Sequence, residues 1–511
     1  MFKKAMAKKT LSGLAVMLAA VGLTACGDGE TSTDSEYRSD AGSVSIILDG
    51  DKIECNSSSV QIDSTTATII SGGEYVISGS LSDGMIIVNV GKSDEVRLVL
   101  DNASVNNSKN AAIYVREAGE TVLTLKDGSS NYLSCDTYTS IDDNNIDGCI
   151  FSKSDFIVNG TGSLDINAKE GHAIVSKDSL DVENGIITIT CAEDALSGKD
   201  SLTVTNGTIT INAGDDGLHS DGTATVSGGK ITIEQCCEGL EGSIVSVTGG
   251  EIKINASDDG INAAGEESGH SVTISGGEIR IKASGDGIDS NGSLLISGGS
   301  VYVSGPENGG NGALDYDSTG QITGGTLIAV GNSQMAMNMD NTSTQGSILI
   351  TTDKTYSSGT EIKVSDSAGN ILICYNSESS FNSVVASAPG MEKGGTYTIS
   401  VDGNDTTVTL EDIIYGNGSG MGFGGMVHGG GMRPDGNGTK PDWSGVKPDG
   451  EGMMPGEMPT GEDGLPEGMM PGEMPTGEDG RPEGMMPGGS KGAGGRDSDG
   501  NNRTTEAEES L

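Results

Sequence analysis

The sequence contains few aromatic and few basic side chains, and both shortages limit what the protein can be. Aromatic residues make up 3% of the 511 residues, and tryptophan occurs once. A core for this chain must therefore be built mainly from Ile, Val, Leu and Ala. Lys and Arg number 29 against 74 Asp and Glu, which gives a formal net charge of −45. Such a surface aids solubility, repels nucleic acid and attracts divalent cations, so we expect no nucleic-acid partner.

The cysteines indicate neither a complete disulfide framework nor a zinc site. There are eight of them, and one, Cys26, belongs to an N-terminal motif, which leaves an odd number. No Cys-x-x-Cys pair occurs, which disfavours zinc. Cys135 and Cys149 could pair, and the sequence leaves their state open.

Long apolar runs are also absent, since the stretch from Leu11 to Val21 is too short to span a membrane. It follows four lysines and precedes Leu23-Thr24-Ala25-Cys26, which matches a lipobox. We therefore predict a signal peptide over residues 1–25, lipidation of Cys26 and a polar tether over 26–43. The expected location is extracytoplasmic, with the lipid anchor as the sole membrane contact. A plain signal peptide followed by a chance cysteine is the alternative.

What the sequence does contain is a repeated turn of about 22 residues with an acidic residue at one fixed place. Each repeat begins at a Gly-Gly or Asn-Gly doublet, whose second residues are Gly185, Gly207, Gly229, Gly250 and Gly277. Nine residues after each doublet stand Asp194, Asp216, Glu238, Asp259 and Asp286. The length of the repeat varies, but this offset does not. Such phasing is typical of a β-solenoid.

Short alternating strands support the same fold. Ile187-Thr188-Ile189, Ile209-Thr210-Ile211 and their equivalents alternate with period two, which predicts strands rather than helices. The doublets supply the positive φ that the corners require. The predicted fold is all-β: a parallel β-helix over residues 44–331, a β cap over 332–415 and a disordered Gly/Met/Pro tail over 416–511.

A solenoid stacks equivalent residues about 4.8 Å apart, so the repeated acids should form a column. Neighbouring carboxylates at that spacing repel by about 1 kcal/mol in water and about 3.5 kcal/mol near a protein surface. A bound cation would remove that cost, and Ca²⁺ prefers carboxylate and carbonyl oxygens. The predicted calcium ligands are Asp194, Asp215, Asp216, Glu238, Asp258, Asp259 and Asp286, with a second cluster at Asp142 and Asp143. The alternative is that Asp precedes Gly because Asp-Gly makes good turns.

Several segments resemble the bacterial extracytoplasmic carbohydrate-binding domain-containing proteins. The matching segments are Ser80–Val88, Ala111–Val115, Ser176-Lys177-Asp178-Ser179-Leu180 and Gly198-Lys199-Asp200-Ser201-Leu202. This resemblance implies a right-handed parallel β-helix, similar to pectate lyases, that binds calcium, cellulose and acidic pectin-type polysaccharide. Of the family's features, the Asp-Gly-Ile/Leu signature falls on Asp216, Asp259 and Asp286.

The expected function is calcium-dependent binding of a polysaccharide, an acidic plant cell-wall glycan or cellulose, without catalysis. One alternative is a pectate lyase or polygalacturonase, because Asp258-Asp259, Gly269-His270 and Arg280-Ile281-Lys282 resemble polygalacturonase motifs in order. Against it, Ser271 replaces the expected second glycine, and Arg280 occupies a strand position shared with Lys253. A structural or adhesion stalk is the third possibility.

Overall fold

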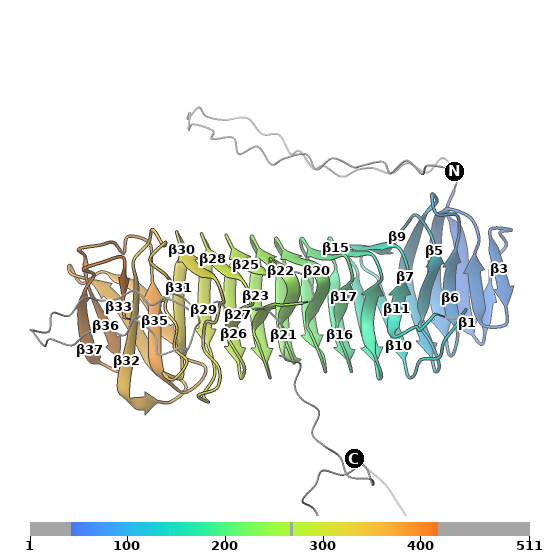
Figure 1. The fold of residues 1–511 in the computed structure, drawn as a ribbon. Helices are drawn as coiled ribbons and strands as arrows, with labels where there is room; N and C mark the ends of the chain where they lie inside the picture. The colour runs from blue at the N-terminus through green and yellow to red at the C-terminus, as the bar shows by residue number, and fades with distance from the viewer. Residues whose placement is uncertain (1–41, 143, 266–268, 417–511) are drawn as a thin grey trace, which may run out of the picture. The chain divides into compact units, whose positions relative to one another are not determined.

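A computed structural model describes residues 42–142, 144–265 and 269–416, and all regular structure in these ranges is β-strand. The strands stack along one axis in a parallel solenoid (Figure 1). The predicted parallel β-helix is thus confirmed. In these ranges no helix is long and apolar enough to cross a membrane. Cys26, Asp143 and the tail predicted over 416–511, apart from Gly416, lie outside the described residues.

Each rung of the solenoid contributes strands to three faces in turn. The first face contains β1 (Val44–Gly50), β5 (Gly73–Leu81), β7 (Glu95–Asn107), β9 (Glu120–Leu125), β12 (Asp155–Gly160), β15 (Ser179–Val182), β18 (Ser201–Val204), the ends of β20 (Leu218–Val226) and β22 (Leu240–Val247), β25 (Ser271–Ile274), β28 (Ser293–Ile296) and β30 (Thr319–Ile322).

The second face continues from the ends of β5 and β7. It contains β10 (Ser130–Cys135), β13 (Ser163–Ala168), β16 (Ile186–Cys191), β19 (Thr208–Asn212), β21 (Lys230–Cys236), β23 (Glu251–Ala256), β26 (Glu278–Ala283), β29 (Ser300–Ser304) and β31 (Thr326–Gly331).

The third face contains β4 (Thr66–Ile69), β6 (Met85–Asn89), β8 (Ile113–Glu117), β11 (Gly148–Ser152), β14 (His172–Ser176), β17 (Leu196–Gly198), the starts of β20 and β22, β24 (Ile261–Ala263) and β27 (Ile288–Ser290). Two short strands, β2 (Lys52–Glu54) and β3 (Val60–Asp63), pair antiparallel with β1 and β4 and close the N-terminal end.

Antiparallel strands end the stack at the other end. β35 (Phe381–Ser387) pairs antiparallel with β31 and with β32 (Ser347–Tyr356), which also pairs with β38 (Ile414–Tyr415). A separate four-stranded sheet follows the order β34 (Ile371–Asn376), β33 (Glu361–Asp366), β36 (Thr396–Val401) and β37 (Asn404–Thr409).

The core consists of aliphatic ladders, as the composition predicts. Ile187, Ile209 and Ile231 are register partners on the second face, and each is at most 1% exposed. Burying such side chains stabilises the fold by roughly 1.5–3 kcal/mol each. A few aromatic side chains, Tyr75 and Phe156 among them, complete the core.

Candidate functional site

The repeated acids lie in the turn between the second and third faces, and the turns of successive rungs stack directly. The residue after each acid donates its backbone N–H to the carbonyl of the acid on the next rung. These bonds join Ala195 to Asp216 (2.9 Å), Gly217 to Glu238 (2.9 Å), Gly239 to Asp259 (3.0 Å) and Gly260 to Asp286 (2.9 Å). The predicted column therefore exists in the structure, and we call Asp194, Asp216, Glu238, Asp259 and Asp286 the acid ladder.

The carboxylates of the acid ladder also bind backbone amides of the next rung. The amide of Asp216 donates to Oδ1 of Asp194 (3.3 Å), and that of Glu238 donates to Oδ1 of Asp216 (3.2 Å). Farther along, the amide of Asp286 donates to Oδ1 of Asp259 (2.5 Å), and Gly312 donates to Asp286. Hydrogen bonds to an ionised acceptor are stronger than neutral ones, so they offset part of the repulsion between the carboxylates.

Ala195 follows Asp194, but the other four ladder acids are each followed by a glycine that close packing, rather than turn conformation, requires. Gly207, in a doublet, has a φ of +112°, as predicted, whereas Gly217 is not among the positive-φ residues. A Cβ on Gly217 would lie 2.6 Å from Cδ1 of Ile233 and 2.7 Å from the carbonyl oxygen of Gly239. The preference for Asp-Gly turns therefore does not explain the repeated motif.

Two histidines neutralise the N-terminal half of the acid ladder. Nδ1 of His219 lies 3.1 Å from Asp216 and 2.5 Å from Glu241, and its Nε2 lies 3.3 Å from Asp221. Burial alone would lower the pKa of His219, but the carboxylates of Asp216 and Glu241 outweigh it and raise that pKa to about 11. His172 likewise lies 3.2 Å from Asp194 and 2.9 Å from Glu193.

The acids respond to these histidines in different ways. Burial would raise the pKa of Asp194, but the bond to His172 outweighs it and lowers that pKa. The bond to His219 lowers the pKa of Glu241. Burial raises the pKa of Asp216 despite the same histidine. The exposed Asp215 completes a group with Asp194 and Asp216 whose oxygens lie within 4.8 Å of one another.

Among the described residues, the C-terminal half of the ladder has no such counterion. Ligand oxygens of Asp259, Asp286 and Asp289 all lie within 4.8 Å of one another, and in the described ranges none of the three forms an ion pair with Lys, Arg or His. Burial raises the pKa values of Asp286 and Asp289 to about 7, and repulsion from Asp259 and Asp315 adds to the effect. We call Asp259, Asp286 and Asp289 the uncompensated cluster.

Two neighbouring features suit a hard cation at the uncompensated cluster. Gly285 leaves room for acids, because a Cβ there would lie 2.3 Å from carboxylate oxygens of both Asp258 and Asp259. Asn262 is the register partner of Asp289, and its buried Oδ1 has no hydrogen-bond partner in the described chain. Its amide nitrogen donates to Glu238 (2.9 Å). Carboxylate and amide oxygens are the ligands that Ca²⁺ prefers.

Acids at the second predicted metal cluster pair with basic side chains. Asp142 pairs with Arg116 (2.6 Å), and the nearby Asp147 pairs with Lys177 (3.5 Å). These acids therefore balance basic side chains of the third face. The role of Asp142 as a metal ligand stays a prediction, and Asp143 lies outside the described residues.

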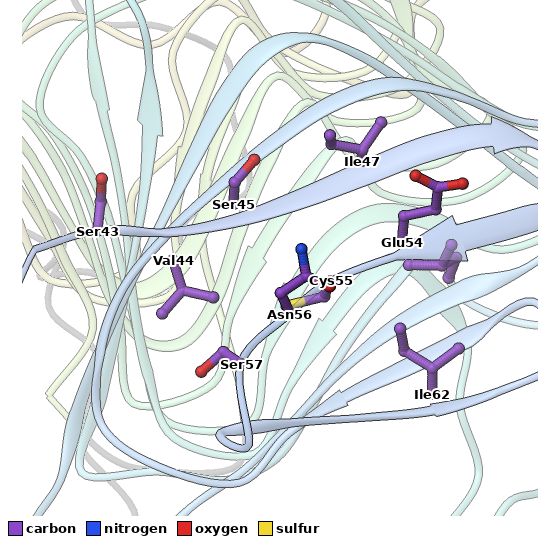
Figure 2. Close-up of a pocket in the computed structure, with 10 residues that line it drawn as sticks. Ser43, Val44, Ser45, Ile47, Glu54, Cys55, Asn56, Ser57 and Ile62 are labelled. Atoms are coloured by element: carbon purple, nitrogen blue, oxygen red, sulfur yellow. The ribbon is translucent and has the colours of Figure 1, made fainter.

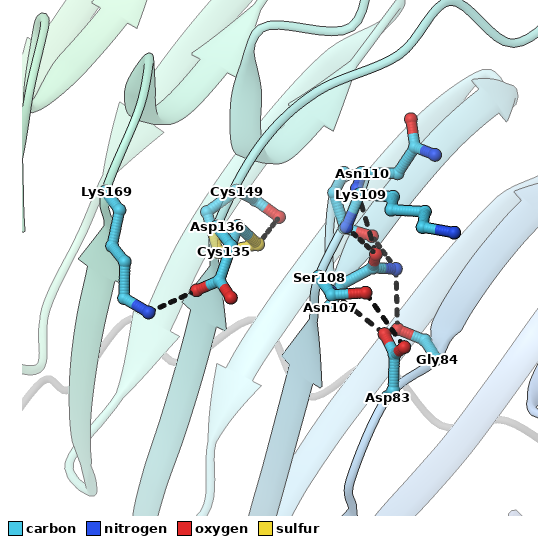
Figure 3. The surroundings of a disulfide bond; sticks show 11 residues. Asp83, Gly84, Asn107, Ser108, Lys109, Asn110, Cys135, Asp136, Cys149 and Lys169 are labelled. Atoms are coloured by element: carbon cyan, nitrogen blue, oxygen red, sulfur yellow. Dashed lines mark hydrogen bonds and ion pairs between the residues drawn. A yellow bond between two sulfur atoms is a disulfide. The ribbon is translucent and has the colours of Figure 1, made fainter.

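The loop that carries Asp142 and Asp147 is closed at its base by a disulfide. Cys135 and Cys149 are bonded, with their Cα atoms 5.5 Å apart (Figure 3). Beside the bond, Asp136 pairs with Lys169 (2.5 Å), as Figure 3 also shows. Ile146 of the loop packs against Tyr114 and Phe151 in a small apolar cluster on the third face. The disulfide thus holds the loop over this face.

A groove of about 800 Å³ adjoins the histidine-containing part of the ladder. It is lined by Lys199, Asp200, His219, Ser220, Asp221, Gly222, Glu241, Ala264 and Gly265. A second pocket, of about 520 Å³, lies at the N-terminal end (Figure 2). Val44, Ile47 and Ile62 give it apolar walls, and Glu54 and Cys55 also line it. No ladder acid lines either cavity, but the groove is linked to the ladder through His219, which pairs with Asp216.

In the sequence, His219, Glu241 and Asp289 are visible as polar residues at one repeated offset, and Glu241 falls in the densest acid patch, but the predicted ligands do not include them. All three stand three residues after a ladder acid, as does Asn262. Register pairs His219 with Glu241, Glu241 with Asn262 and Asn262 with Asp289. This second polar column runs beside the acid ladder, so the site is two columns wide.

Comparison with known proteins places this solenoid in a family. The sequence model of the carbohydrate-binding domain-containing proteins matches residues 63–312. A protein of that description from Acetivibrio thermocellus is 31% identical over 188 residues, which are 36% of this chain and 66% of the relative. The chain belongs to the carbohydrate-binding domain-containing protein family.

A solved structure is also similar to this chain. It is the polysaccharide lyase-like protein from C. thermocellum, determined as a gadolinium derivative. The two are 31% identical, and the match covers 50% of this chain and 97% of the other, with a TM-score of 0.41.

Proposed function

We propose that this protein is a cell-surface lipoprotein that binds acidic polysaccharide through calcium and does not cleave it. The observation that carries the proposal is the uncompensated cluster, where three acids converge with no basic partner in the described chain. Family membership supports carbohydrate as the ligand. The lipid anchor on Cys26 and the extracytoplasmic location rest on the lipobox.

Calcium would serve two purposes at this face. It would neutralise Asp259, Asp286 and Asp289, with Asn262 in position to supply a neutral oxygen. It would also leave coordination positions for a uronate carboxylate of the glycan. Without a cation, an acidic glycan and a chain of net charge −45 would repel each other.

The aromatic residues favour an acidic, pectin-type glycan over cellulose. A neutral glycan would need exposed aromatic faces on which to stack. Tyr114 is fully buried, and the ring of Tyr302 is stacked on Tyr375 with the Arg280 guanidinium 4.3 Å from its centroid. Trp443 lies outside the described residues. Cellulose is therefore the second candidate ligand.

The parts of the resemblance to polygalacturonases do not converge in space. Asp259 lies in the turn between the second and third faces, whereas His270 directly precedes β25 on the first face. Arg280 lies on the second face and binds Glu278 (2.9 Å). Cleavage needs an acid, a base and a charge stabiliser around one bond, so this arrangement favours binding without catalysis.

Retention on immobilised polygalacturonate tests the proposal, with the purified protein in calcium and then in chelator. We expect retention in calcium, loss in chelator, and neither unsaturated uronides nor new reducing ends. Asp286→Asn with Asp289→Asn should abolish the effect of calcium. Asp405→Asn, an exposed acid on β37, is the matched control.

Three other outcomes would contradict the proposal in different ways. Sustained turnover of polygalacturonate, abolished by Arg280→Ala, would establish the lyase or hydrolase alternative. Retention on cellulose alone would reject an acidic ligand. No retention on either glycan, together with no turnover, would favour a structural stalk.

A further inference from the structure

Basic residues form a second ladder on the third face, at the ends of its strands. Lys153, Lys177 and Lys199 each follow the last residue of β11, β14 and β17, and Arg116 is the equivalent residue on β8. The amide of Lys153 donates to the carbonyl of Val115 (3.1 Å), that of Lys177 to Ser152 (2.8 Å) and that of Lys199 to Ser176 (3.0 Å). Four cations therefore stand on consecutive rungs, about 4.8 Å apart.

This basic ladder is unexpected in a chain with 29 basic and 74 acidic residues. Like charges at the spacing of neighbouring rungs repel one another, and solubility does not require them in register. Lys153, Lys177 and Lys199 are exposed, so burial of the charges does not explain their positions. Two of the lysines belong to the repeated segments Ser176-Lys177-Asp178-Ser179 and Gly198-Lys199-Asp200-Ser201. Neither segment contributes a residue to the uncompensated cluster.

The fold already places carboxylates on this ladder. Asp142 binds Arg116 (2.6 Å) and Asp147 binds Lys177 (3.5 Å), and both acids come from the disulfide-closed loop. The longer of the two contacts is weak and leaves Lys177 partly exposed. Lys153 bonds to the Asn144 amide oxygen (3.0 Å). Lys199 makes no ion pair within the described ranges, and it lines the groove of about 800 Å³ together with His219.

We propose that Lys177 and Lys199, with Lys153 beside them, bind the anionic groups of a polysaccharide directly and without metal. A chain lying along the third face would contact the basic ladder on the earlier rungs. On later rungs of the same face it would reach the uncompensated cluster. The class of ligand rests on the proposed function, but this contact requires no calcium. The ligand that fits these lysines is a linear polysaccharide that carries carboxylate or sulfate groups.

Binding in chelator isolates this second site, because calcium can then make no contribution. Retention of the full chain would be measured on polygalacturonate, on dextran sulfate and on a neutral glucan across a range of salt concentrations. We expect retention on at least one anionic polymer that weakens as salt screens the charges, and none on the neutral glucan. The polymer that binds more tightly identifies carboxylate or sulfate as the preferred group.

Lys177→Ala with Lys199→Ala should weaken this retention about fivefold and make it less sensitive to salt. Lys199→Glu alone should weaken it further. Lys230→Ala is the matched control, since Lys230 is an exposed lysine on the second face that pairs with Glu251 (2.7 Å). Equal retention of the lysine variants and the wild type, or no retention on either anionic polymer in chelator, would overturn the inference. Neither result bears on calcium-dependent retention, so the two proposals can fail separately.

Discussion

The backbone amide of Asp286 donates a hydrogen bond to a carboxylate oxygen of Asp259 on the preceding rung, at 2.5 Å. This bond ties the acid ladder to the main chain, so the ladder acids serve the fold as well as any ligand. Asparagine in place of these aspartates keeps an oxygen acceptor but removes the charge. Asp→Asn substitutions can therefore separate cation binding from folding.

Calcium should raise the melting temperature of the protein, because binding to the folded state alone stabilises it. The gain is about 2.7 kcal/mol at a calcium concentration 100 times the dissociation constant. Asp259→Asn with Asp286→Asn should keep the fold and lose most of this shift, whereas Asp405→Asn should keep it. Thermal melts in calcium and in chelator provide the measurement. Coincident wild-type curves in the two conditions would reject a bound ion.

Stability in chelator should fall as the pH rises from about 4 to about 7. The pKa values of Asp286 and Asp289 are raised to about 7 in the folded protein, so the folded state holds protons that the unfolded state has released. The unfolded state then binds fewer protons, and the free energy of unfolding decreases with pH across this window. Calcium should flatten the dependence by replacing the protons. A melting temperature that rises with pH in chelator would contradict these pKa shifts.

His219→Gln should make the N-terminal half of the ladder respond to calcium. The imidazolium now neutralises Asp216 and Glu241, and its raised pKa, about 11, contributes stability that is complete below the unfolded pKa and lost as the pH rises through the folded value. Without it, the acids lack their counterion. We expect a lower melting temperature in chelator than the wild type and a larger shift on adding calcium. An unchanged calcium shift would show that these acids do not bind the ion.

Removal of the disulfide should loosen the loop over the third face. Cross-linking a loop of this length stabilises a protein by about 3 kcal/mol in the chain-entropy model, and Cys135 and Cys149 are separated by 14 residues. The double variant Cys135→Ser with Cys149→Ser should melt at a lower temperature and exchange the amide hydrogens of the loop faster. Exchange in β23 and β26, on rungs far from the loop, serves as the internal reference. Unchanged exchange in the loop would mean that Ile146 and its apolar contacts suffice to hold it.

Cys26→Ala should release the protein from the membrane fraction, because lipidation at a lipobox requires the cysteine sulfur. The measurement is fractionation of cells that express the wild type or the variant. The control is Cys374→Ala, which removes an exposed thiol elsewhere in the chain. Membrane association that persists in Cys26→Ala would reject the lipoprotein prediction.

The parallel solenoid and the acid column could both be predicted from the sequence alone. Both follow from local rules, because each repeat of about 22 residues contains the same strand pattern, the same glycine doublet and an acid at the same offset. Stacking then places Asp194 to Asp286 in line whatever else the chain does. The same periodicity predicted the aliphatic ladders, such as the one through Ile187 and Ile209.

The ion pairs that each acid makes, and so which acids lack a counterion among the described residues, became clear in the folded protein. In sequence, Asp216 and Asp286 occupy equivalent positions, yet His219 lies beside the first and Asp289 beside the second. Those neighbours come from a second column whose charges do not repeat. Asp142 depends likewise on Arg116, which a disulfide-closed loop brings near. The electrostatic environment of an acid depends on its distance from charged groups on neighbouring rungs and loops. A repeat pattern specifies the rungs, but it does not specify the loops that fold back onto them.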